Sequence, residues 1–231
     1  DSKSIAYTSR KKEGVEYAIS TDTDICLYNL ATGNTVNLCK PAGYKEPIID
    51  ATKSMKDQDV NHQKGDMHVG YDVNPKFSAD GKYIAWQSME RNGYESDRNG
   101  LCVMEIATGK KKYVTESFDS NVDDYCWSKD SKTMYFMGVW HATEMLYQTN
   151  LEGKIMQITD GWYDYGSVQL ANNSNYLLAS RHSHQYGDEL YIVKPGKEKK
   201  AKVEQVTFEN KHIYDQLALG KTQQRWVKTT D

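Results

Sequence analysis

Two histidines stand one residue apart in the segment Arg181-His-Ser-His184, and this spacing could serve metal chemistry. In a β-strand, residues i and i+2 point to the same face, so His182 and His184 would lie side by side, as a two-histidine metal site requires. We find no third ligand at short range in the sequence. We therefore interpret the pair as polar side chains that face a channel, and we predict no metal there.

A second group of metal-ligand types lies in the polar insertion 41–70. The group comprises Asp57, Asp59, His62, Asp66 and His68. Its spacing fits neither a zinc motif nor an EF-hand loop, which needs acids at fixed offsets and a central glycine. We interpret the insertion as a solvated mobile loop. We predict no metal and no cofactor for this chain.

A charged loop at 89–99 is the strongest candidate for a binding site. It carries Glu90, Arg91, Tyr94, Glu95, Asp97 and Arg98. Loops on rigid scaffolds carry binding residues more often than the scaffold itself, which favours a site for a charged ligand group. The other interpretation is an exposed loop whose alternating charges pair with one another. The residues alone leave both interpretations open.

A recurring phrase predicts the scaffold that positions these groups. Its copies are Pro75–Trp86, Cys126–Phe136, Gln169–Ala179 and, at the start of the chain, Asp1–Tyr7. Aligned on the turn, Asp80, Asp130 and Asn173 lie 50 and then 43 residues apart. A period of 40–50 residues with several short strands per unit is typical of a β-propeller blade.

Each repeat has the same order of elements. An aromatic-rich strand enters a Ser-x-Asp-Gly-Lys turn, and a second strand such as Tyr83–Ser88 follows. A third strand, such as Asp24–Leu30, turns through Ala-Thr-Gly into a fourth, Thr35–Leu38. We predict an all-β fold, a partial β-propeller of about four four-stranded antiparallel blades. The predicted blades span about 1–40, 71–116, 123–161 and 166–209, with the insertion 41–70 between the first two.

The tail departs from this pattern. Residues 212–220 and 224–228 read as two further strands that belong to no complete blade. We therefore predict that 211–231 begins a linker into another domain. The chain also opens inside a repeat, so we expect it to be part of a longer polypeptide whose first blade lacks its opening strand. Open strand edges would then be satisfied by self-association or by the tail pairing with the first blade.

Two aromatic clusters, Trp140-His141 and Trp162–Tyr165, follow predicted strands. Either could be a stacking platform for a peptide or a sugar, but packing between adjacent blades is the favoured interpretation, because propellers bury large aromatic side chains there.

The four cysteines show no C-x-x-C spacing. They are Cys26, Cys39, Cys102 and Cys126. We predict buried free thiols, because cysteine is among the most buried residue types. Cys26 and Cys39 lie on opposite arms of one predicted hairpin, so a disulfide between them stays open for an oxidising compartment.

Composition excludes two classes of partner. The net charge of −3 argues against an electrostatic footprint for nucleic acid. No apolar run approaches the roughly 18 residues that a membrane helix needs, so we predict no membrane insertion.

Several of these phrases resemble a known family. The Phe-Ser-x-Asp-Gly-Lys and Ala-Thr-Gly units, the segment Gln205–Asn210 and the tail Arg225–Asp231 are similar to the propeller of prolyl-oligopeptidase-family serine peptidases. The most similar subgroup is the bacterial dipeptidyl-peptidase and acylaminoacyl-peptidase-like enzymes. TolB-like propellers share the Phe-Ser-x-Asp-Gly turn, so the tail and the segment Ser88–Arg98 are the more discriminating parts.

The resemblance implies a division of labour. In the family, the tail leads into an α/β-hydrolase domain that carries the nucleophile, whereas this sequence contains no Gly-x-Ser-x-Gly elbow and no catalytic residue. Related dipeptidyl peptidases hold the ammonium of the peptide N-terminus on propeller carboxylates, and an arginine can hold a carbonyl. Carried over, Glu90 with Glu95 would form the clamp, and Arg91 or Arg98, near Tyr94, would orient it.

The expected function is therefore non-catalytic. The chain would gate access and position the N-terminus of a peptide substrate for the hydrolase domain of the same chain. The alternative is a TolB-like propeller that binds another protein and has no peptidase partner. The resemblance implies a periplasmic or cell-envelope location in a bacterium.

Overall fold

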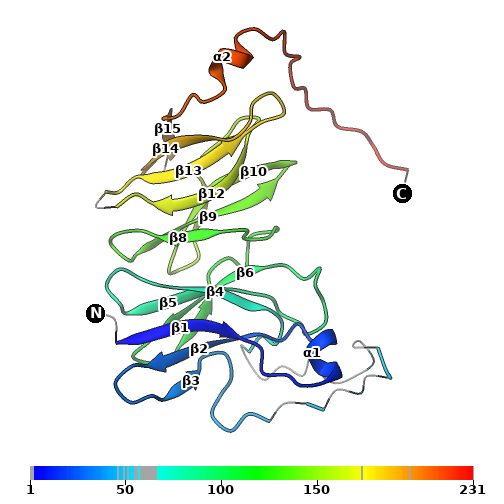
Figure 1. The fold of residues 1–231 in the computed structure, drawn as a ribbon, viewed down its shortest axis with the longest axis vertical. Coiled ribbons are helices and arrows are strands. Elements are labelled where there is room, and N and C mark those ends of the chain that lie inside the picture. Colours follow the sequence, from blue (N-terminus) through cyan, green and yellow to red (C-terminus); the bar gives the residue numbers. More distant parts are fainter. Residues whose placement is uncertain are drawn as a thin grey trace. The chain divides into compact units, whose positions relative to one another are not determined.

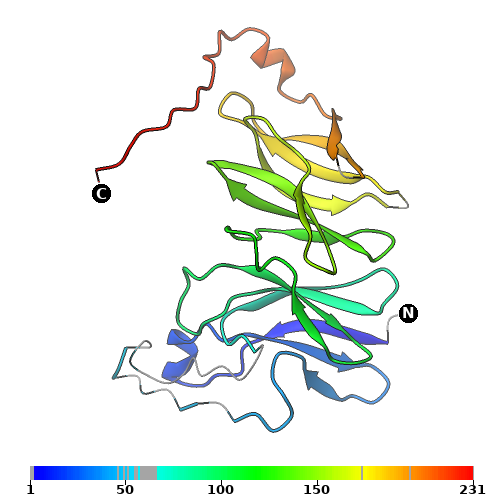
Figure 2. The same ribbon diagram turned by 180° about the vertical axis from the view of Figure 1, so that it is seen from behind.

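The structure is a computed structural model that describes residues 3–45, 47–48, 50, 52–54, 57, 67–172, 174–197 and 199–230. Nearly all of its regular structure is β, arranged as four antiparallel sheets (Figures 1 and 2). The predicted fold class, a partial β-propeller, is confirmed. Among the described residues, no helix is long and apolar enough to cross a membrane.

The first two sheets come from the N-terminal part of the chain. The three-stranded sheet contains β1 (Ser4–Ser9), β2 (Asp24–Asn29) and β3 (Thr35–Asn37), with the short helix α1 (Val15–Ile19) between β1 and β2. The next sheet contains β4 (Asp72–Phe77), β5 (Tyr83–Ser88), β6 (Gly100–Glu105) and β7 (Lys111–Tyr113). In both sheets the strands neighbour one another in chain order.

The other two sheets repeat this arrangement. One contains β8 (Tyr125–Trp127), β9 (Thr133–Trp140), β10 (Thr143–Asn150) and β11 (Ile155–Gln157). The last contains β12 (Asp164–Leu170), β13 (Leu177–His182), β14 (Glu189–Gly196) and β15 (Lys199–Gln205), and the short helix α2 (Lys211–Tyr214) follows it.

The chain divides into two compact units. Unit 1 comprises Asp1–Asp123, Trp127–Met134 and Thr149–Ile155, and unit 2 comprises Asp124–Cys126, Tyr135–Gln148 and Met156–Asp231. The first two sheets therefore lie in unit 1 and the fourth sheet lies in unit 2, so the two units are described separately below.

The recurring phrase forms the same hydrogen-bonded turn in each copy that can be compared. In the first, the Ser78 hydroxyl donates to Asp80 Oδ1 (2.7 Å) and accepts the Tyr83 amide (3.0 Å). Asp80 Oδ1 also accepts the Lys82 amide at 3.1 Å, and Gly81 has a φ of +69°, where a side chain would be strained. The Ser78 and Lys82 donors hold the pKa of Asp80 below its usual value.

The second copy reproduces the turn without glycine. The Ser128 hydroxyl donates to Asp130 Oδ1 at 2.6 Å, and that oxygen accepts the Lys132 amide at 3.1 Å. Ser131 takes the glycine position with a φ of +60°. Its hydroxyl oxygen accepts the Asp80 amide at 3.0 Å and so joins the two turns. The phrase recurs because side-chain bonds to the turn backbone require serine and aspartate two residues apart.

A shared apolar core holds the first two sheets together in unit 1. Its buried members are Ile25, Cys39, Ile84, Trp86, Cys102 and Met104. The Trp86 indole is 1% exposed and donates its N–H to Asp72 Oδ1 at 2.7 Å, so its one polar atom is satisfied. All four cysteines are buried free thiols, as predicted, and the open alternative of a Cys26–Cys39 disulfide does not occur.

The two predicted tail strands are wrong. Residues 211–214 form α2, held by an ion pair from Lys211 to Asp215 at 2.7 Å, and no strand follows in 215–230. Trp226 and Val227 are 75% and 82% exposed, so no strand or core of the described residues covers this segment, and Trp226 contacts the His141 ring edge to face. Alternating polarity had suggested strands, but a strand also needs a partner for its backbone groups.

The favoured interpretation of the aromatic clusters, packing between adjacent blades, is wrong for the two tryptophans. Tyr165 is fully buried, whereas Trp140 and Trp162 are 45% and 47% exposed. Trp140 instead stacks on His141, with ring centroids 4.4 Å apart. Trp140 is the last residue of β9 and Trp162 lies just before β12, so both side chains reach solvent at a strand end.

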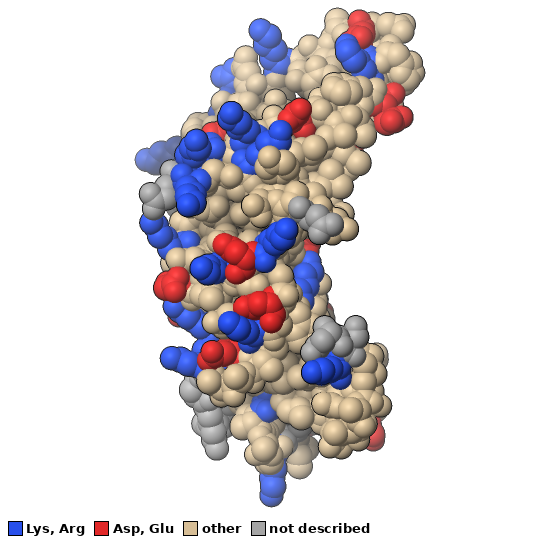
Figure 3. All heavy atoms as spheres, turned by 90° about the vertical axis from the view of Figure 1, so that its left-hand side faces the viewer, with Lys and Arg blue, Asp and Glu red and all other residues tan. Residues whose placement is uncertain are grey.

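Surface charge is mixed. On the face in Figure 3, Lys and Arg side chains lie among Asp and Glu side chains and uncharged surface. On this face the pattern agrees with the small net charge of −3.

Candidate functional site

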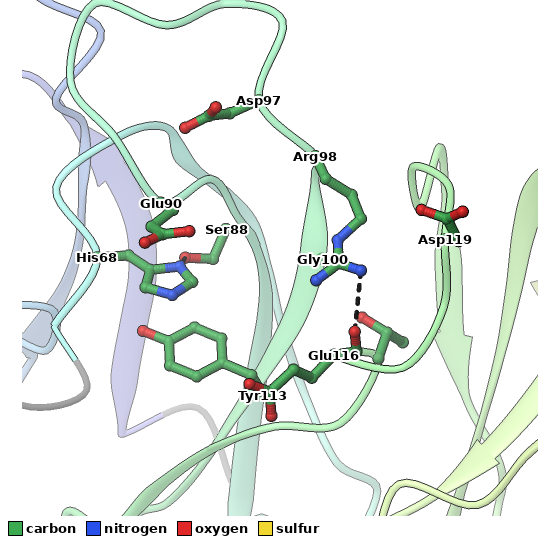
Figure 4. A pocket seen from close by; sticks show the side chains of 10 residues that line it. His68, Ser88, Glu90, Asp97, Arg98, Gly100, Tyr113, Glu116 and Asp119 are labelled. Atoms are coloured by element: carbon green, nitrogen blue, oxygen red, sulfur yellow. Dashed lines mark hydrogen bonds between the residues drawn. The ribbon is translucent and has the colours of Figure 1, made fainter. Parts of the chain in front are cut away.

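A cavity of about 390 Å³ opens in unit 1 at the end of the β4–β7 sheet where β5 and β7 end and β6 begins. The register pairs Ser88, the last residue of β5, with Gly100, the first of β6. The lining residues are His68, Ser88, Glu90, Asp97, Arg98, Gly100, Tyr113, Thr115, Glu116 and Asp119 (Figure 4). The size is that of a small-molecule site.

The last residues of the insertion form one wall of this cavity. The Val69 amide donates to the carbonyl of Glu90 at 3.0 Å, and the Met89 amide donates to that of Tyr71 at 2.7 Å. Gly70 is required for this approach, because a Cβ there would lie 2.7 Å from the Met89 carbonyl oxygen. This backbone pairing places His68 beside Ser88 at the end of β5.

His68 is held on two sides. Its ring stacks on Tyr113 with centroids 3.8 Å apart and planes 17° apart, and its Nδ1 lies 3.0 Å from the Ser88 hydroxyl. Burial lowers the pKa of His68, although Glu90 acts in the opposite direction. His68 is therefore a neutral imidazole at pH 7. Figure 4 shows His68, Ser88, Glu90 and Tyr113 together at one side of the cavity.

Part of the predicted charged loop is internally paired. The Arg91 guanidinium binds the buried carboxylate of Asp97, which also accepts the Arg91 amide at 3.0 Å. The guanidinium carbon lies 4.1 Å from the centre of the Tyr94 ring. Three of the loop residues thus form a self-contained cluster that fixes the loop conformation.

The structure places the remaining predicted residues differently. Glu90 and Arg98 line the cavity, and Arg98 donates to the carbonyls of Glu116 (2.9 Å) and Phe118 (2.7 Å). Glu95 is exposed and is not among the lining residues. The cavity therefore brings Glu90 together with Arg98 but not with Glu95.

The cavity is acidic. Its carboxylates are Glu90, Asp97, Glu116 and Asp119, and its one guanidinium among the described residues is Arg98. Asp97 is neutralised by Arg91, and carboxylates still outnumber the guanidinium in the lining. Excess negative charge in a partly enclosed site favours a cationic ligand group, because the acids repel anions and can accept hydrogen bonds from an ammonium.

The sequence interpretation missed the part of the cavity wall that the end of the insertion forms. The end of the insertion is packed rather than solvated, since Met67 and Val69 are buried. Its Asp57 is exposed, and the predicted positions Asp59, His62 and Asp66 lie outside the described residues. The apolar alternation of Met67, Val69 and Tyr71 around His68 was the available signal for an extended, packed segment.

The two histidines do not form the predicted strand pair. β13 ends at His182, so His184 lies beyond the strand and is exposed. His182 Nδ1 lies 3.2 Å from Asp188 Oδ1, and its Nε2 lies 4.0 Å from Asp164 Oδ2. The short-range acid that the sequence interpretation overlooked is Asp188, and it pairs with the imidazole.

A buried group in unit 1 has metal-ligand chemistry. One ligand atom each from Asp24, Cys39 and Asp72 lies within 4.8 Å of the others. Each residue already has a protein partner: Asp24 binds Lys40 at 3.1 Å, Cys39 Sγ accepts the Ile25 amide at 3.1 Å, and Asp72 accepts the Trp86 indole. The lysine ammonium supplies the positive charge that a metal would bring, so we assign no metal here.

Asp72 is connected to the cavity through the lining residue Ser88. Burial raises its pKa to about 7, while hydrogen bonds from Ser88, Cys39 and Trp86 oppose the rise. Since Ser88 also contacts His68 in the cavity wall, the buried carboxyl and the cavity share one hydroxyl. Asp72 carries a proton over the acidic pH range.

Solved structures define the class. The fold matches Pyrococcus horikoshii acylaminoacyl peptidase with a TM-score of 0.62 at 15% identity, covering 94% of this chain and 27% of that one. It matches TolB from Acinetobacter baumannii with a TM-score of 0.56 at 15% identity, covering 90% and 42%. At this identity the likeness concerns the fold alone, and the chain is a β-propeller protein. No family model matches the sequence.

Sequence comparison is more specific. The chain is 43% identical over 232 aligned residues to dipeptidyl-peptidase 5 of Porphyromonas gingivalis and 39% identical to that of Porphyromonas endodontalis, each time along its whole length. It spans 29% of the length of either relative. The resemblance predicted from the repeat and the tail, to dipeptidyl peptidases of the prolyl-oligopeptidase family, is confirmed.

Proposed function

We propose that this chain is the propeller part of a serine dipeptidyl peptidase and that it binds the free N-terminal ammonium of a peptide. The carrying observation is the acidic cavity at the end of the β4–β7 sheet, in a chain 43% identical to a dipeptidyl-peptidase 5. A dipeptidyl peptidase must measure two residues from the N-terminus. A carboxylate on the rigid scaffold would hold the ammonium at a fixed position and so set the distance from the N-terminus to the cleaved bond.

Glu90 is the principal acid of the proposal. It lines the cavity beside the neutral ring of His68, whereas Glu95 lies outside the lining. An ammonium donates three hydrogen bonds, which the Glu90 carboxylate, the Ser88 hydroxyl and acids of the 116–119 segment can accept. Arg98, held by two carbonyls, can orient a peptide carbonyl.

The ligand pair Ala-Phe-amide and N-acetyl-Ala-Phe-amide tests this proposal by calorimetry. The two differ only in the charged amine, and neither has a carboxylate. We expect the free amine to bind about tenfold more tightly, since a charge-assisted hydrogen bond contributes about 1.5–3 kcal/mol. Glu90→Gln should remove the preference.

Glu95→Gln is the matched control, because it makes the same charge change outside the cavity. It should keep the preference within about twofold, as expected for an exposed charge. Equal binding of the two ligands by the unchanged protein would overturn the amine site. Loss of the preference in Glu95→Gln instead of Glu90→Gln would move the site out of the cavity.

The wider assembly is part of the same proposal. A hydrolase domain on the same polypeptide would supply the nucleophile, the propeller would gate access to it, and a bacterial periplasm or cell envelope would be the location. In the intact enzyme, Glu90→Gln should slow cleavage of free-amino substrates more than of N-blocked ones. A stable complex with another protein and no cleavage by the intact polypeptide would favour the TolB-like alternative.

A further inference from the structure

Unit 2 contains an arginine enclosed by aromatic rings. The guanidinium carbon of Arg181, on β13, lies 3.8 Å from the centre of the Tyr163 ring and 3.7 Å from that of Tyr191. The centre of the Tyr165 ring is 6.0 Å away. Rings this close cover both faces of the planar group, so only its N–H edge can donate hydrogen bonds.

This guanidinium has no acidic partner among the described residues. The strand register places Glu189 directly opposite Arg181, yet no carboxylate lies within 4.0 Å of it. Glu189 instead accepts the Thr207 hydroxyl and, at 3.4 Å, the Asn210 amide. Arg181 Nε is buried and has no hydrogen-bond acceptor among the described residues, although the guanidinium as a whole acts on the Tyr165 hydroxyl and opposes the rise of that tyrosine's pKa on burial. A buried guanidinium N–H without an acceptor is costly, and a ligand anion would remove that cost.

The arginine lines a cavity of about 320 Å³. Its other lining residues are Tyr163, Tyr186, Glu189, Tyr191, Gln205, Phe208, Lys211, Tyr214 and Asp215. The Lys211 ammonium is neutralised by Asp215 at 2.7 Å, so Arg181 is the cation of the lining that is not in an ion pair. The aromatic walls suit an apolar ligand body, and the volume suits a group of dipeptide size.

The side of the cavity formed by α2 is attached to the fourth sheet. The Gly187 amide donates to the Tyr214 hydroxyl at 2.7 Å, and the rings of Tyr186 and Tyr214 meet edge to face with centroids 5.0 Å apart. The helix is thus docked on the β13–β14 connection rather than loosely attached. The cavity is therefore a formed feature of unit 2.

We propose that this cavity binds the carboxylate of a peptide whose last residue is apolar, with Arg181 as the anchor. A carboxylate matches the N–H edge that the rings leave uncovered, because its two oxygens accept two parallel hydrogen bonds in the plane of the guanidinium. The apolar side chain would pack on the tyrosine and phenylalanine walls. This site is separate from the amine site of unit 1 and requires no peptidase activity.

The test compares N-acetyl-Ala-Phe, which has a free carboxylate, with N-acetyl-Ala-Phe-amide. Both lack a free amine, so failure of the amine site would leave this comparison unaffected. We expect calorimetry of the unchanged protein to show at least tenfold tighter binding of the acid. Equal affinity for acid and amide, or no binding of either, would overturn the proposal without depending on any variant.

Variants of Arg181 then test whether its guanidinium binds the ligand carboxylate. Arg181→Gln should abolish the preference for the acid. Arg181→Lys should keep only part of it, because an ammonium keeps the charge but cannot donate two parallel hydrogen bonds from one planar edge. Lys194→Gln is the matched control: it removes a cation on β14 that is paired with Glu204 and lies outside the cavity lining. Retained preference in folded Arg181→Gln would overturn the assignment.

Inorganic phosphate distinguishes a peptide carboxylate from a general anion site. We expect phosphate to bind more weakly than N-acetyl-Ala-Phe, because it cannot use the aromatic walls. Tighter binding of phosphate, with displacement of the peptide acid, would overturn the peptide assignment. Thermal unfolding of each variant confirms that a loss of binding is not a loss of fold.

Discussion

The two cavities differ both in charge and in what supports that charge. In unit 1, acids on loops surround the ends of β5, β6 and β7, and the cation of the lining is held by backbone carbonyls. In unit 2, one arginine rises from a strand between two tyrosine rings. Both cavities belong to sheets with the same strand order. A repeated blade therefore sets where a pocket forms, while individual side chains set the charge that the pocket accepts.

The mode of support also predicts how each cavity responds to solution conditions. Glu90 and Asp119 are exposed acids, so salt should screen their attraction for an ammonium. Arg181 is covered by rings on both faces, so its interaction with a carboxylate should be screened less. Three substitutions test this comparison: one at the buried acid Asp72, one in the loop beside the first cavity, and one at the turn common to the blades.

The largest effect is expected at Asp72. The folded protein keeps its proton up to about pH 7, whereas the unfolded chain releases it near pH 3.8. The folded state binds more protons between these values, so the free energy of unfolding falls as pH rises through that window. At about 1.4 kcal/mol per pH unit, the loss reaches about 4 kcal/mol.

Asp72→Asn mimics the protonated acid and should flatten this dependence. Denaturant unfolding of both proteins between pH 4 and pH 8 measures it. The Asn side chain can still accept the Trp86 indole N–H, so the variant should fold. An unchanged pH slope would show that Asp72 is ionised in the folded protein.

A smaller effect is expected at Asp97. Asp97→Asn removes the anion bound to Arg91 and turns one accepting oxygen into a donor. Because Arg91 is 46% exposed, we expect a cost of only about 1–2 kcal/mol. Amide hydrogen exchange should accelerate in 90–98 and stay unchanged in β12–β15. Uniform acceleration in both units would mean that the loop is not an independent support of the first cavity.

The smallest effect is expected at Gly81. Nothing lies within 4 Å of a Cβ added there, so Gly81→Ala tests only the φ of +69°. We expect a loss of about 1 kcal/mol in unfolding free energy. Affinities for the amine and the carboxylate ligands should both stay within twofold. A change in either affinity would show that the turn shapes a cavity as well as the scaffold.

The repeat was sufficient to predict the propeller because its turns are local. Ser78 and Asp80 satisfy turn backbone groups within five residues, so their order in the sequence already specifies the structure. The exposed tail was predicted wrongly for the converse reason. Apolar neighbours such as Trp226 and Val227 form part of a strand only when another strand is available, and the local sequence does not report that.

The candidate site was only partly predictable. The charged loop stood out by composition, and Glu90 and Arg98 do line a cavity. The pairing of Arg91 with Asp97, and the exclusion of Glu95, follow from how the loop folds back on itself. No local pattern showed that His68 would stack on Tyr113, because the two residues are 45 positions apart in the sequence.

The sequence by itself determined the blade, its turns and the resemblance to dipeptidyl peptidases, because these depend on residues a few positions apart and on identity along the chain. Tertiary structure alone decided which charges are neutralised and which are left for a ligand. Asp97 meets Arg91 and is neutralised, whereas Arg181 faces Glu189 across two strands and is not paired with it. Ion pairing depends on distances of a few ångströms between side chains, and only packing sets those distances.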